Sequence, residues 1–248
     1  MTTIGAGSNT VQGRNALAKT FIKADPYLWP HDGLLQPQTT ALLVIDMQRD
    51  FCDPDGYLAA SGYDIRATRS IVPNVASVCQ TVRDWGGLII CTREGHRPDL
   101  SDLPPLKRWR SERGGGEIGT PGPMGRLLVR GEQGWDIIDE LKPQPGDVVV
   151  DKPGYSAFFA TDLERILSTR GIRNLILTGV TTDVCVHSTL REAVDRNYEC
   201  LVIEDACAAS VLENHTSALR TIATEGGIFG AVAKSGSVRR ALGEGFSV

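Results

Sequence analysis

Hydrophobic residues occur along this chain in short, unbroken runs, separated by longer stretches that mix apolar and polar positions. The runs cover residues 41–45, 88–92, 148–150, 175–177, 201–203 and, more weakly, 228–232. Because the runs are continuous rather than alternating, they are typical of strands covered on both faces in a parallel sheet. Helical patterns cover residues 65–85, 162–168, 184–196, 213–224 and 238–242. This alternation of strands and helices predicts a three-layer α/β sandwich with right-handed crossovers.

Two parts of the chain depart from this alternation. Residues 1–38 are polar and contain glycines and prolines, so we expect an N-terminal arm that lies on the surface or on a partner subunit. Residues 39–248 contain no linker or repeat and are predicted to form one domain. Within it, residues 93–133 contain five prolines and the basic cluster 107–110, which indicates a long loop insertion. Such a loop is either an irregular surface segment or a lid or subunit contact.

Composition mainly excludes classes of protein. The 248 residues are 41% hydrophobic and carry a net charge of −4, which favours neither nucleic acid nor a membrane as partner. No apolar run approaches the roughly 18 residues of a membrane span, and no secretory signal is recognised, so a cytoplasmic location is expected. The six cysteines and four histidines lack metal-ligand and disulfide-scaffold spacings. Residues 114–119 fit Gly-x-Gly-x-x-Gly but follow no strand, so no dinucleotide cofactor is expected.

Three reactive side chains follow predicted strands, at the edge where parallel α/β sheets bind ligands. Asp46 follows the run 41–45; a carboxylate there is partly desolvated and can act as a base, or else it bonds backbone amides. Lys152 follows the run 148–150 and could place a cation beside a developing anion, although a solvated surface lysine is the simpler interpretation. Cys185 lies where a helix begins after the fourth run, which fits either a thiolate nucleophile or a small buried apolar residue.

Taken together, segments 44–51, 151–158 and 177–186 resemble three motifs of the isochorismatase-like cysteine hydrolases, in the same order. The resemblance covers about residues 40–235 and implies a central six-stranded parallel sheet with Rossmann-like topology, assembled as a homo-oligomer, either a dimer or a tetramer. It also implies a catalytic triad, and a cis peptide bond whose bend aims two backbone N–H groups at the substrate carbonyl. The triad is Asp46, Lys152 and Cys185, the cis bond joins Val180 and Thr181, and the two N–H groups are those of Thr181 and Cys185.

Within that family, the chain looks similar to biuret hydrolases and ureidoacrylate amidohydrolases. Residues 92–100, 107–111 and 134–138 look like the first group, whereas 144–147 and 155–159 look like the second. Nicotinamidases are also similar, but they carry an Asp/His metal site after the second strand. This chain has only His96 there, so neither a metal nor another cofactor is expected.

Five residues are expected to bind the substrate. Phe51 lies five positions after Asp46 and could pack on a flat substrate, and an arginine such as Arg93 could pair with a carboxylate. Glu225 precedes two glycines between a helix and the last strand, so it lies either at the pocket mouth or at a solvated helix end. At the mouth it would favour neutral substrates rich in N–H groups over anionic ones. His96 and Tyr155 complete the set.

These features predict a metal-independent cysteine amidohydrolase of nitrogen metabolism. It would cleave a C–N bond of a small carbamoyl or ureido compound, biuret or a close relative, and release ammonia through a thioester intermediate. The alternative is an N-carbamoylsarcosine-type or ureidoacrylate-type amidase whose substrate carries a carboxylate. A third possibility, from a different class, is a member of the fold that binds ligands or assembles without catalysis; the intact set of Asp, Lys and Cys argues against it.

Overall fold

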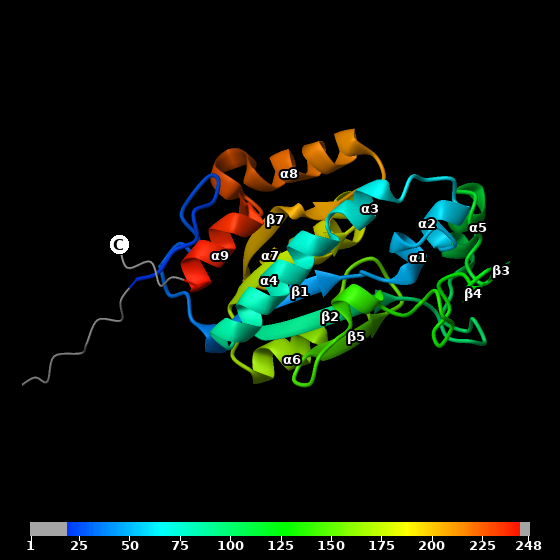
Figure 1. The fold of residues 1–248 in the computed structure, drawn as a ribbon, viewed down its shortest axis with the longest axis horizontal. Coiled ribbons are helices and arrows are strands. Elements are labelled where there is room, and N and C mark those ends of the chain that lie inside the picture. Colours follow the sequence, from blue (N-terminus) through cyan, green and yellow to red (C-terminus); the bar gives the residue numbers. More distant parts are fainter. Residues whose placement is uncertain (1–18, 244–248) are drawn as a thin grey trace, which may run out of the picture.

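The computed structural model describes residues 19–243, in which helices cover both faces of a six-stranded sheet (Figure 1). All six strands are parallel and lie in the order β5-β2-β1-β6-β7-β8. Their bounds are β1 Thr40–Ile45, β2 Leu88–Glu94, β5 Val148–Lys152, β6 Asn174–Val180, β7 Glu199–Ala208 and β8 Ala231–Ala233. The α/β class and the central six-stranded parallel sheet are therefore confirmed.

Helices on the two faces enclose two separate hydrophobic cores. Helices α4 (Val72–Trp85) and α9 (Ser235–Gly243) pack on one face. The other face is covered by α6 (Leu163–Thr169), α7 (His187–Asp195) and α8 (Leu212–Gly227). In Figure 1, α4 and α9 lie in front of the sheet, which agrees with this division. Right-handed crossover connections between parallel strands require such helices on both sides.

The central strand β1 shows why its sequence is apolar at every position. Successive side chains of a strand point to opposite faces of the sheet. Leu42 and Val44 belong to the core beneath α4, whereas Leu43 and Ile45 belong to the core beneath α6 and α7. Both sets are almost fully buried, so a polar residue at any of these positions would lose its hydration.

Two predicted elements differ in detail from the structure. The pattern over 65–85 forms two helices, α3 (Arg66–Ser70) and α4, with Ile71 between them. The last strand begins at Ala231, three residues later than predicted, because Gly230 has a φ of +128°. A Cβ atom at Gly230 would lie 2.4 Å from the carbonyl oxygen of Cys200, so only glycine fits this approach.

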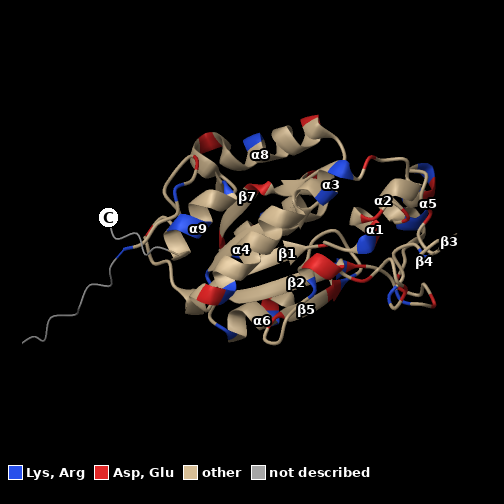
Figure 2. Ribbon diagram, viewed as in Figure 1, with Lys and Arg blue, Asp and Glu red and all other residues tan. Residues whose placement is uncertain are grey.

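The remaining elements surround the carboxyl edge of the sheet. Short helices α1 (Arg49–Cys52) and α2 (Tyr57–Ala60) follow β1. The segment 93–133, expected as a loop, contains helix α5 (Pro105–Arg113) and the strands β3 (Pro121–Gly122) and β4 (Gly125–Arg126). Figure 2 shows that Lys and Arg lie beside Asp and Glu around α1, α2 and α5, so this end of the molecule is densely charged. Two short 3₁₀ helices cover Pro37–Thr39 and Asp139–Leu141.

The described part of the N-terminal arm, residues 19–38, packs onto the domain. Ile22 and Trp29 are fully buried in the core beneath α4, and the backbone of Asp25 pairs with Val232 in β8. Residues 1–18 of the expected arm lie outside the described part of the chain. Between residues 19 and 243, none of the helices combines the length and the apolar character that a bilayer crossing requires.

Candidate active site

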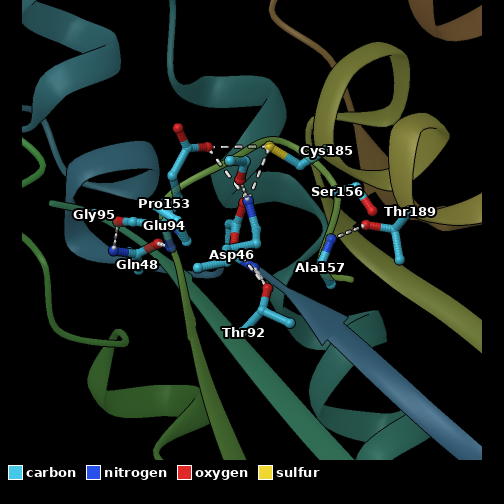
Figure 3. A network of polar contacts seen from close by, with 12 residues as sticks. Asp46, Gln48, Thr92, Glu94, Gly95, Pro153, Ser156, Ala157, Cys185 and Thr189 are labelled. Atoms are coloured by element: carbon cyan, nitrogen blue, oxygen red, sulfur yellow. Dashed lines mark hydrogen bonds and ion pairs between the residues drawn. The ribbon is translucent and has the colours of Figure 1, made fainter. Parts of the chain in front are cut away.

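Four polar side chains meet where neighbouring strands end (Figure 3). Asp46 directly follows β1, Glu94 ends β2 and Lys152 ends β5, while Cys185 lies in the π-helix η3 (Thr182–Val186) after β6. Because β5, β2, β1 and β6 are adjacent in the sheet, residues far apart in the sequence converge at one edge. Glu94 and Lys152 are directly opposite each other in the pairing of β2 with β5.

The ammonium group of Lys152 lies at the centre of this group and is fully buried. Its Nζ atom is 2.8 Å from Oδ2 of Asp46, and 3.4 Å from both Oε2 of Glu94 and Sγ of Cys185. It also donates to the carbonyl of Gly154 at 2.9 Å. Burial alone would lower the pKa of Lys152, but Asp46 and the other acidic neighbours raise it above its ordinary value. The lysine is therefore a fixed cation.

The carboxylate of Asp46 is held on both of its oxygens. The hydroxyl of Thr92 donates to Oδ1 at 2.6 Å, and Lys152 contacts Oδ2. Burial raises the pKa of Asp46 above that of an ordinary aspartate, and the nearby ammonium group opposes that rise. Asp46 also has a φ of +52°, which turns the chain sharply where β1 ends. A buried carboxylate with a raised pKa is suited to accept a proton.

The thiol of Cys185 lies between the ammonium group and two carboxylates. Its Sγ atom is 3.2 Å from Oε2 of Glu94, and its distance to a carboxylate oxygen of Asp46 is within 4.8 Å. Burial raises the pKa of Cys185 well above its ordinary value, and Lys152 opposes that rise. The resting site therefore holds a neutral thiol beside a permanent cation that would stabilise its thiolate. The peptide bond between Val180 and Thr181, just before η3, is cis.

Glu94 is a site residue that sequence reasoning missed. Its Oε1 atom is 2.6 Å from Nζ of Lys107, which also donates to the carbonyl of Pro153 at 2.7 Å. Burial alone would raise the pKa of Glu94, but Lys152 and Lys107 outweigh it and lower the pKa to about 2. The side chain of Gln48 fixes the backbone of Glu94 on both sides, donating to its carbonyl at 2.9 Å and accepting from its N–H at 2.7 Å.

The position of Glu94 could have signalled its role. It follows the second apolar run in the same way that Asp46 follows the first and Lys152 the third, at the same edge of the sheet. The predicted strand ended at residue 92, two positions before the observed end of β2. Lys107 offered no comparable signal, because its helix α5 was not predicted.

The donor atoms of this site resemble a metal-binding set. Single ligand atoms of Asp46, Glu94 and Cys185 all lie within 4.8 Å of one another. The ammonium group of Lys152, however, is within 3.4 Å of all three side chains and already supplies the compensating positive charge. These residues therefore do not fit a metal ion unless the lysine moves away. The group His31, Asp32 and Glu199 on the surface is likewise paired, through its own His–Glu contact and through an arginine.

A cavity of about 290 Å³ opens above the thiol. Cys185 and Thr181 lie at its floor, and two of the five expected substrate-binding residues, Phe51 and Tyr155, line its walls. Helix α5 contributes Lys107 and Arg110. The other lining residues are mostly aromatic or aliphatic: Tyr57, Leu58, Tyr63, Glu94, Ser111, Ile118, Leu128, Asp183, Val184, Ser210, Val211 and Asn214.

Arg93 does not reach this cavity, which corrects the expectation that it binds substrate. Side chains alternate along β2, so Arg93 points away from the face on which its neighbours contact Asp46 and the thiol. Its guanidinium group pairs with Asp151 at 2.8 Å and lies 3.6 Å from the ring centre of Trp135.

His96 is also placed elsewhere, beneath the insertion. Its side chain is fully buried, and Nδ1 lies 3.3 Å from a carboxylate oxygen of Asp102. Burial lowers the pKa of His96, and the positive charge of Lys107 lowers it further. The residue therefore supports the fold of the insertion and does not line the cavity.

Glu225 lies far from the cavity of its own chain, so the expectation that it faces that pocket is wrong. Helix α8 begins next to Val211, which lines the cavity, and leads away from the carboxyl edge. At about 1.5 Å per residue, Glu225 is roughly 20 Å further along. It is exposed and has a φ of +52° where the helix kinks. A helix that follows a parallel strand returns to the opposite edge of the sheet, which accounts for this position.

Fold and site together define an α/β protein with a buried thiol, lysine and two carboxylates at the carboxyl edge of its sheet. The model of the isochorismatase domain matches residues 40–234, and the chain belongs to that family. A cysteine hydrolase from Pseudomonas syringae pv. phaseolicola is similar, with 29% identity over 92% of this chain and 99% of that one, and a TM-score of 0.74. An N-carbamoylsarcosine amidase from Thermoplasma acidophilum has 28% identity over 79% and 96% of the two chains and a TM-score of 0.61. A pyrazinamidase/nicotinamidase from Streptococcus mutans has 28% identity over 78% and 99%, and a TM-score of 0.64.

Proposed function

We propose that this protein is an amidohydrolase that cleaves a C–N bond of a small carbamoyl or ureido compound, such as biuret, through a thioester on Cys185. The observation that carries the proposal is the thiol itself. It lies at the floor of a cavity, 3.4 Å from a buried ammonium group and within 4.8 Å of two carboxylates. Amidases among the similar solved structures support the same class of reaction.

In the first half of the proposed reaction, Asp46 takes the proton of Cys185 and the thiolate attacks the substrate carbonyl carbon. The C–S bond forms and the carbonyl oxygen becomes an oxyanion. The backbone N–H groups of Thr181 and Cys185, together with Lys152, are suited to hold that charge. Asp46 then returns its proton to the leaving nitrogen, the C–N bond breaks, and ammonia departs from the thioester.

In the second half, a water molecule attacks the thioester carbonyl while Asp46 accepts its proton. The tetrahedral intermediate collapses, the C–S bond breaks, and the thiolate regains a proton from Asp46. Lys152 matters in both halves because the buried thiol resists ionisation, and an adjacent cation lowers the free energy of the thiolate. The reaction needs no group beyond these residues and water.

The size of the cavity supports a small substrate. Its volume of about 290 Å³ corresponds to roughly ten water molecules. The aromatic rings of Phe51 and Tyr155 border it and offer faces on which a planar ureido group can pack. These features fit biuret with space to spare.

A second candidate, a substrate that also carries a carboxylate, is favoured by Arg110. This residue lines the cavity and, within residues 19–243, its guanidinium group forms no ion pair. The other two cations of the site are occupied, since Lys152 pairs with Asp46 and Lys107 pairs with Glu94. A carboxylate on the substrate would find its partner in Arg110.

Ammonia release from a panel of compounds tests both candidates. The panel contains biuret, triuret, N-carbamoyl amino acids, ureidoacrylate and nicotinamide, each assayed with the native protein and with Cys185→Ser. Turnover of a ureido compound that disappears in the variant supports the proposal, and preference within the panel separates neutral from carboxylate-bearing substrates. Absence of ammonia from every compound would favour a member of the fold that binds without catalysis.

We also propose a homo-oligomer, dimer or tetramer. Several large apolar side chains are exposed, including Trp109 at 52%, Phe159 at 60% and Leu212 at 72%. Burial of exposed apolar surface favours association. Sedimentation at several protein concentrations measures the state directly, and a monomer at all concentrations would refute it.

A further inference from the structure

The two carboxylates beside the thiol differ in their contacts in the resting site. Both oxygens of Asp46 are engaged inside the protein, by Thr92 and by Lys152, and Asp46 does not line the cavity. Glu94 does line it. One oxygen of Glu94 is held by Lys107, while the other, Oε2, contacts the thiol at 3.2 Å and the ammonium group of Lys152 at 3.4 Å (Figure 3).

One of the two partners of Oε2, the thiol, changes during the reaction. In the resting site the thiol can donate its proton toward Oε2 of Glu94. Once Cys185 becomes a thiolate or a thioester, that donor is gone, yet Glu94 remains ionised because two ammonium groups keep its pKa low. Oε2 then keeps only the 3.4 Å contact with Lys152, so this carboxylate oxygen has the capacity to accept a further hydrogen bond. A substrate bound above the thiol can supply this hydrogen-bond donor.

The geometry indicates which substrate group would donate. An attacked carbonyl carbon must approach Sγ to about 3–3.5 Å. A nitrogen bonded to that carbon then comes within hydrogen-bond reach of an oxygen that is itself 3.2 Å from Sγ. A urea-type carbonyl carries two nitrogens, one that leaves and one that stays. In the proposed reaction the proton that Asp46 takes from Cys185 goes to the nitrogen that leaves, so the nitrogen that stays is the one available to Glu94.

We propose, on the basis of the amide hydrolysis proposed above, that Glu94 accepts a hydrogen bond from the retained N–H of the substrate. It thereby selects ureido and carbamoyl compounds over simple amides, in which carbon replaces that nitrogen. Lys107 is the positioning residue for Glu94. Its Nζ atom binds Oε1 of Glu94 at 2.6 Å and the carbonyl of Pro153 at 2.7 Å, which fixes the orientation of the carboxylate and therefore the position of Oε2.

Lys107 reaches the site from one face of helix α5. Lys107, Arg110 and Ser111 lie at positions i, i+3 and i+4 of α5, so they share one face of that helix, and all three line the cavity. Arg108, on another face of the same helix, pairs with Glu117. The insertion thus delivers a specific face of a helix to the site, and its outward face offers a matched control.

The test compares substrates that differ only in the retained nitrogen. Malonamide is biuret with a methylene group in place of the central N–H, and succinamic acid stands in the same relation to N-carbamoylglycine. The measured quantity is the ratio of kcat/KM for each ureido compound to that for its methylene analogue. This ratio is insensitive to any general loss of thiol reactivity, because such a loss affects both members of a pair.

Four variants are compared with the native protein. We expect Glu94→Gln to lower the ratio by about 10–100-fold, the range for one hydrogen bond to a charged acceptor. Lys107→Met should lower it in the same direction, and Lys107→Arg should restore much of it. Arg108→Met, the matched control on α5, should leave it unchanged. Thermal unfolding of each variant shows that the compared proteins are folded.

The outcomes separate this inference from the proposed function. Ammonia release with an unchanged ratio in both Glu94→Gln and Lys107→Met would overturn the role of Glu94 while leaving the amidohydrolase intact. The role of Glu94 would also be overturned if the native protein's ratio were close to the ratio of the uncatalysed hydrolysis rates of the same two compounds. Absence of ammonia from all four compounds would overturn both, and the wider panel then decides whether any amide is cleaved.

Discussion

The floor of the cavity and the wall formed by α5 are built by different means. At the floor, Cys185 of η3 is backed by Asp46 and Lys152, which stand at strand ends. All three side chains are almost fully buried, and the carboxylate and the ammonium group compensate each other's charge. The wall belongs to an insertion, and Lys107 and Arg110 reach the cavity from a helix whose other side is in solvent. A site of this kind can hold its chemistry rigid while its preference for substrates depends on a more exposed element.

Removal of the thiol is the strongest way to break the floor. Cys185→Ser should lower kcat on the order of 10⁴-fold or more, because a hydroxyl is far less acidic and less nucleophilic than a thiol. Substrate should still bind, since the cavity walls are unchanged. Ammonia release and equilibrium binding measure the two effects. A variant that keeps more than about a tenth of the native rate would exclude Cys185 as the nucleophile.

Removal of the base should be the next largest effect. Asp46→Asn retains the shape and the contact with Thr92 but cannot accept the thiol proton, so kcat should fall about 10²–10⁴-fold. In the native protein, kcat/KM should decline as pH falls through the raised pKa of Asp46, since protonation removes the base. The decline should be absent from the residual activity of the variant. A native pH profile in the variant would contradict the assignment.

Replacement of the buried cation should cost somewhat less catalysis but more stability. Lys152→Met keeps the length of the side chain and removes the charge beside the oxyanion, for which one lost donor costs about 10²–10³-fold in kcat. Asp46 and Glu94 would then lack their central partner, so the melting temperature should also fall. Kinetics and thermal unfolding on the same preparation test this pair of effects. Near-normal turnover would remove Lys152 from the mechanism.

A change in the wall should affect only some substrates. Arg110→Gln should raise KM for carboxylate-bearing ureido compounds about 10–100-fold, because it removes the one cavity cation that has no ion pair in the described part of the chain. The effect on biuret should be much smaller. Arg108→Gln, on the outward side of α5, serves as control. Equal effects of Arg110→Gln on both kinds of substrate would argue against the second candidate.

The smallest effect concerns the joint between the two regions. Asp50, next to the floor, accepts hydrogen bonds from the N–H groups of Tyr57 and of Leu128 in the insertion. Burial raises the pKa of Asp50 to about 6, above the value near 3.9 of an unfolded chain. The stabilising contribution of the protonated side chain is therefore complete below about pH 4 and is lost as pH rises through 6.

Comparison with Asp50→Asn, which does not titrate, isolates that contribution. The free energy of unfolding of the native protein relative to the variant should decrease by about 2–3 kcal/mol between pH 4 and pH 7. Chemical denaturation at a series of pH values provides the measurement. A difference that stays constant over this range would mean that Asp50 titrates normally.

The residues of the floor could be predicted from the sequence because two patterns occur together: a continuously apolar strand and a reactive residue just after it. Strands covered on both faces are continuously apolar, so the run before Asp46 and the run before Lys152 were visible, and reactive residues of parallel sheets follow such runs. The same rules would have found Glu94 if the predicted strand had been extended beyond Thr92 and through Arg93. Nearness to the strand end suggests that Arg93 reaches the site, but the alternation of side chains along β2 directs it to the opposite face.

The wall was not predictable in the same way. Helix α5 turns a charged face toward the cavity, and a single buried residue, Ser111, lies within it. Without an apolar stripe, the usual helical signal is missing, and the surrounding prolines suggest a loop. The expectation for Glu225 was wrong for a topological reason: α8 leads from the cavity back toward the opposite edge of the sheet, so its end lies far from the cavity mouth.

The ion pair between Lys107 and Glu94 joins two parts of the molecule that can vary separately. One half of the link belongs to the sheet and the other to a segment inserted between β2 and β5. Replacing that segment in a single genetic event would change the walls of the cavity while leaving the strand ends untouched. For protein engineers, residues 97–133 are accordingly the part to exchange when a new substrate is sought. Glu94 should be retained, and each replacement segment should supply a cation that pairs with it.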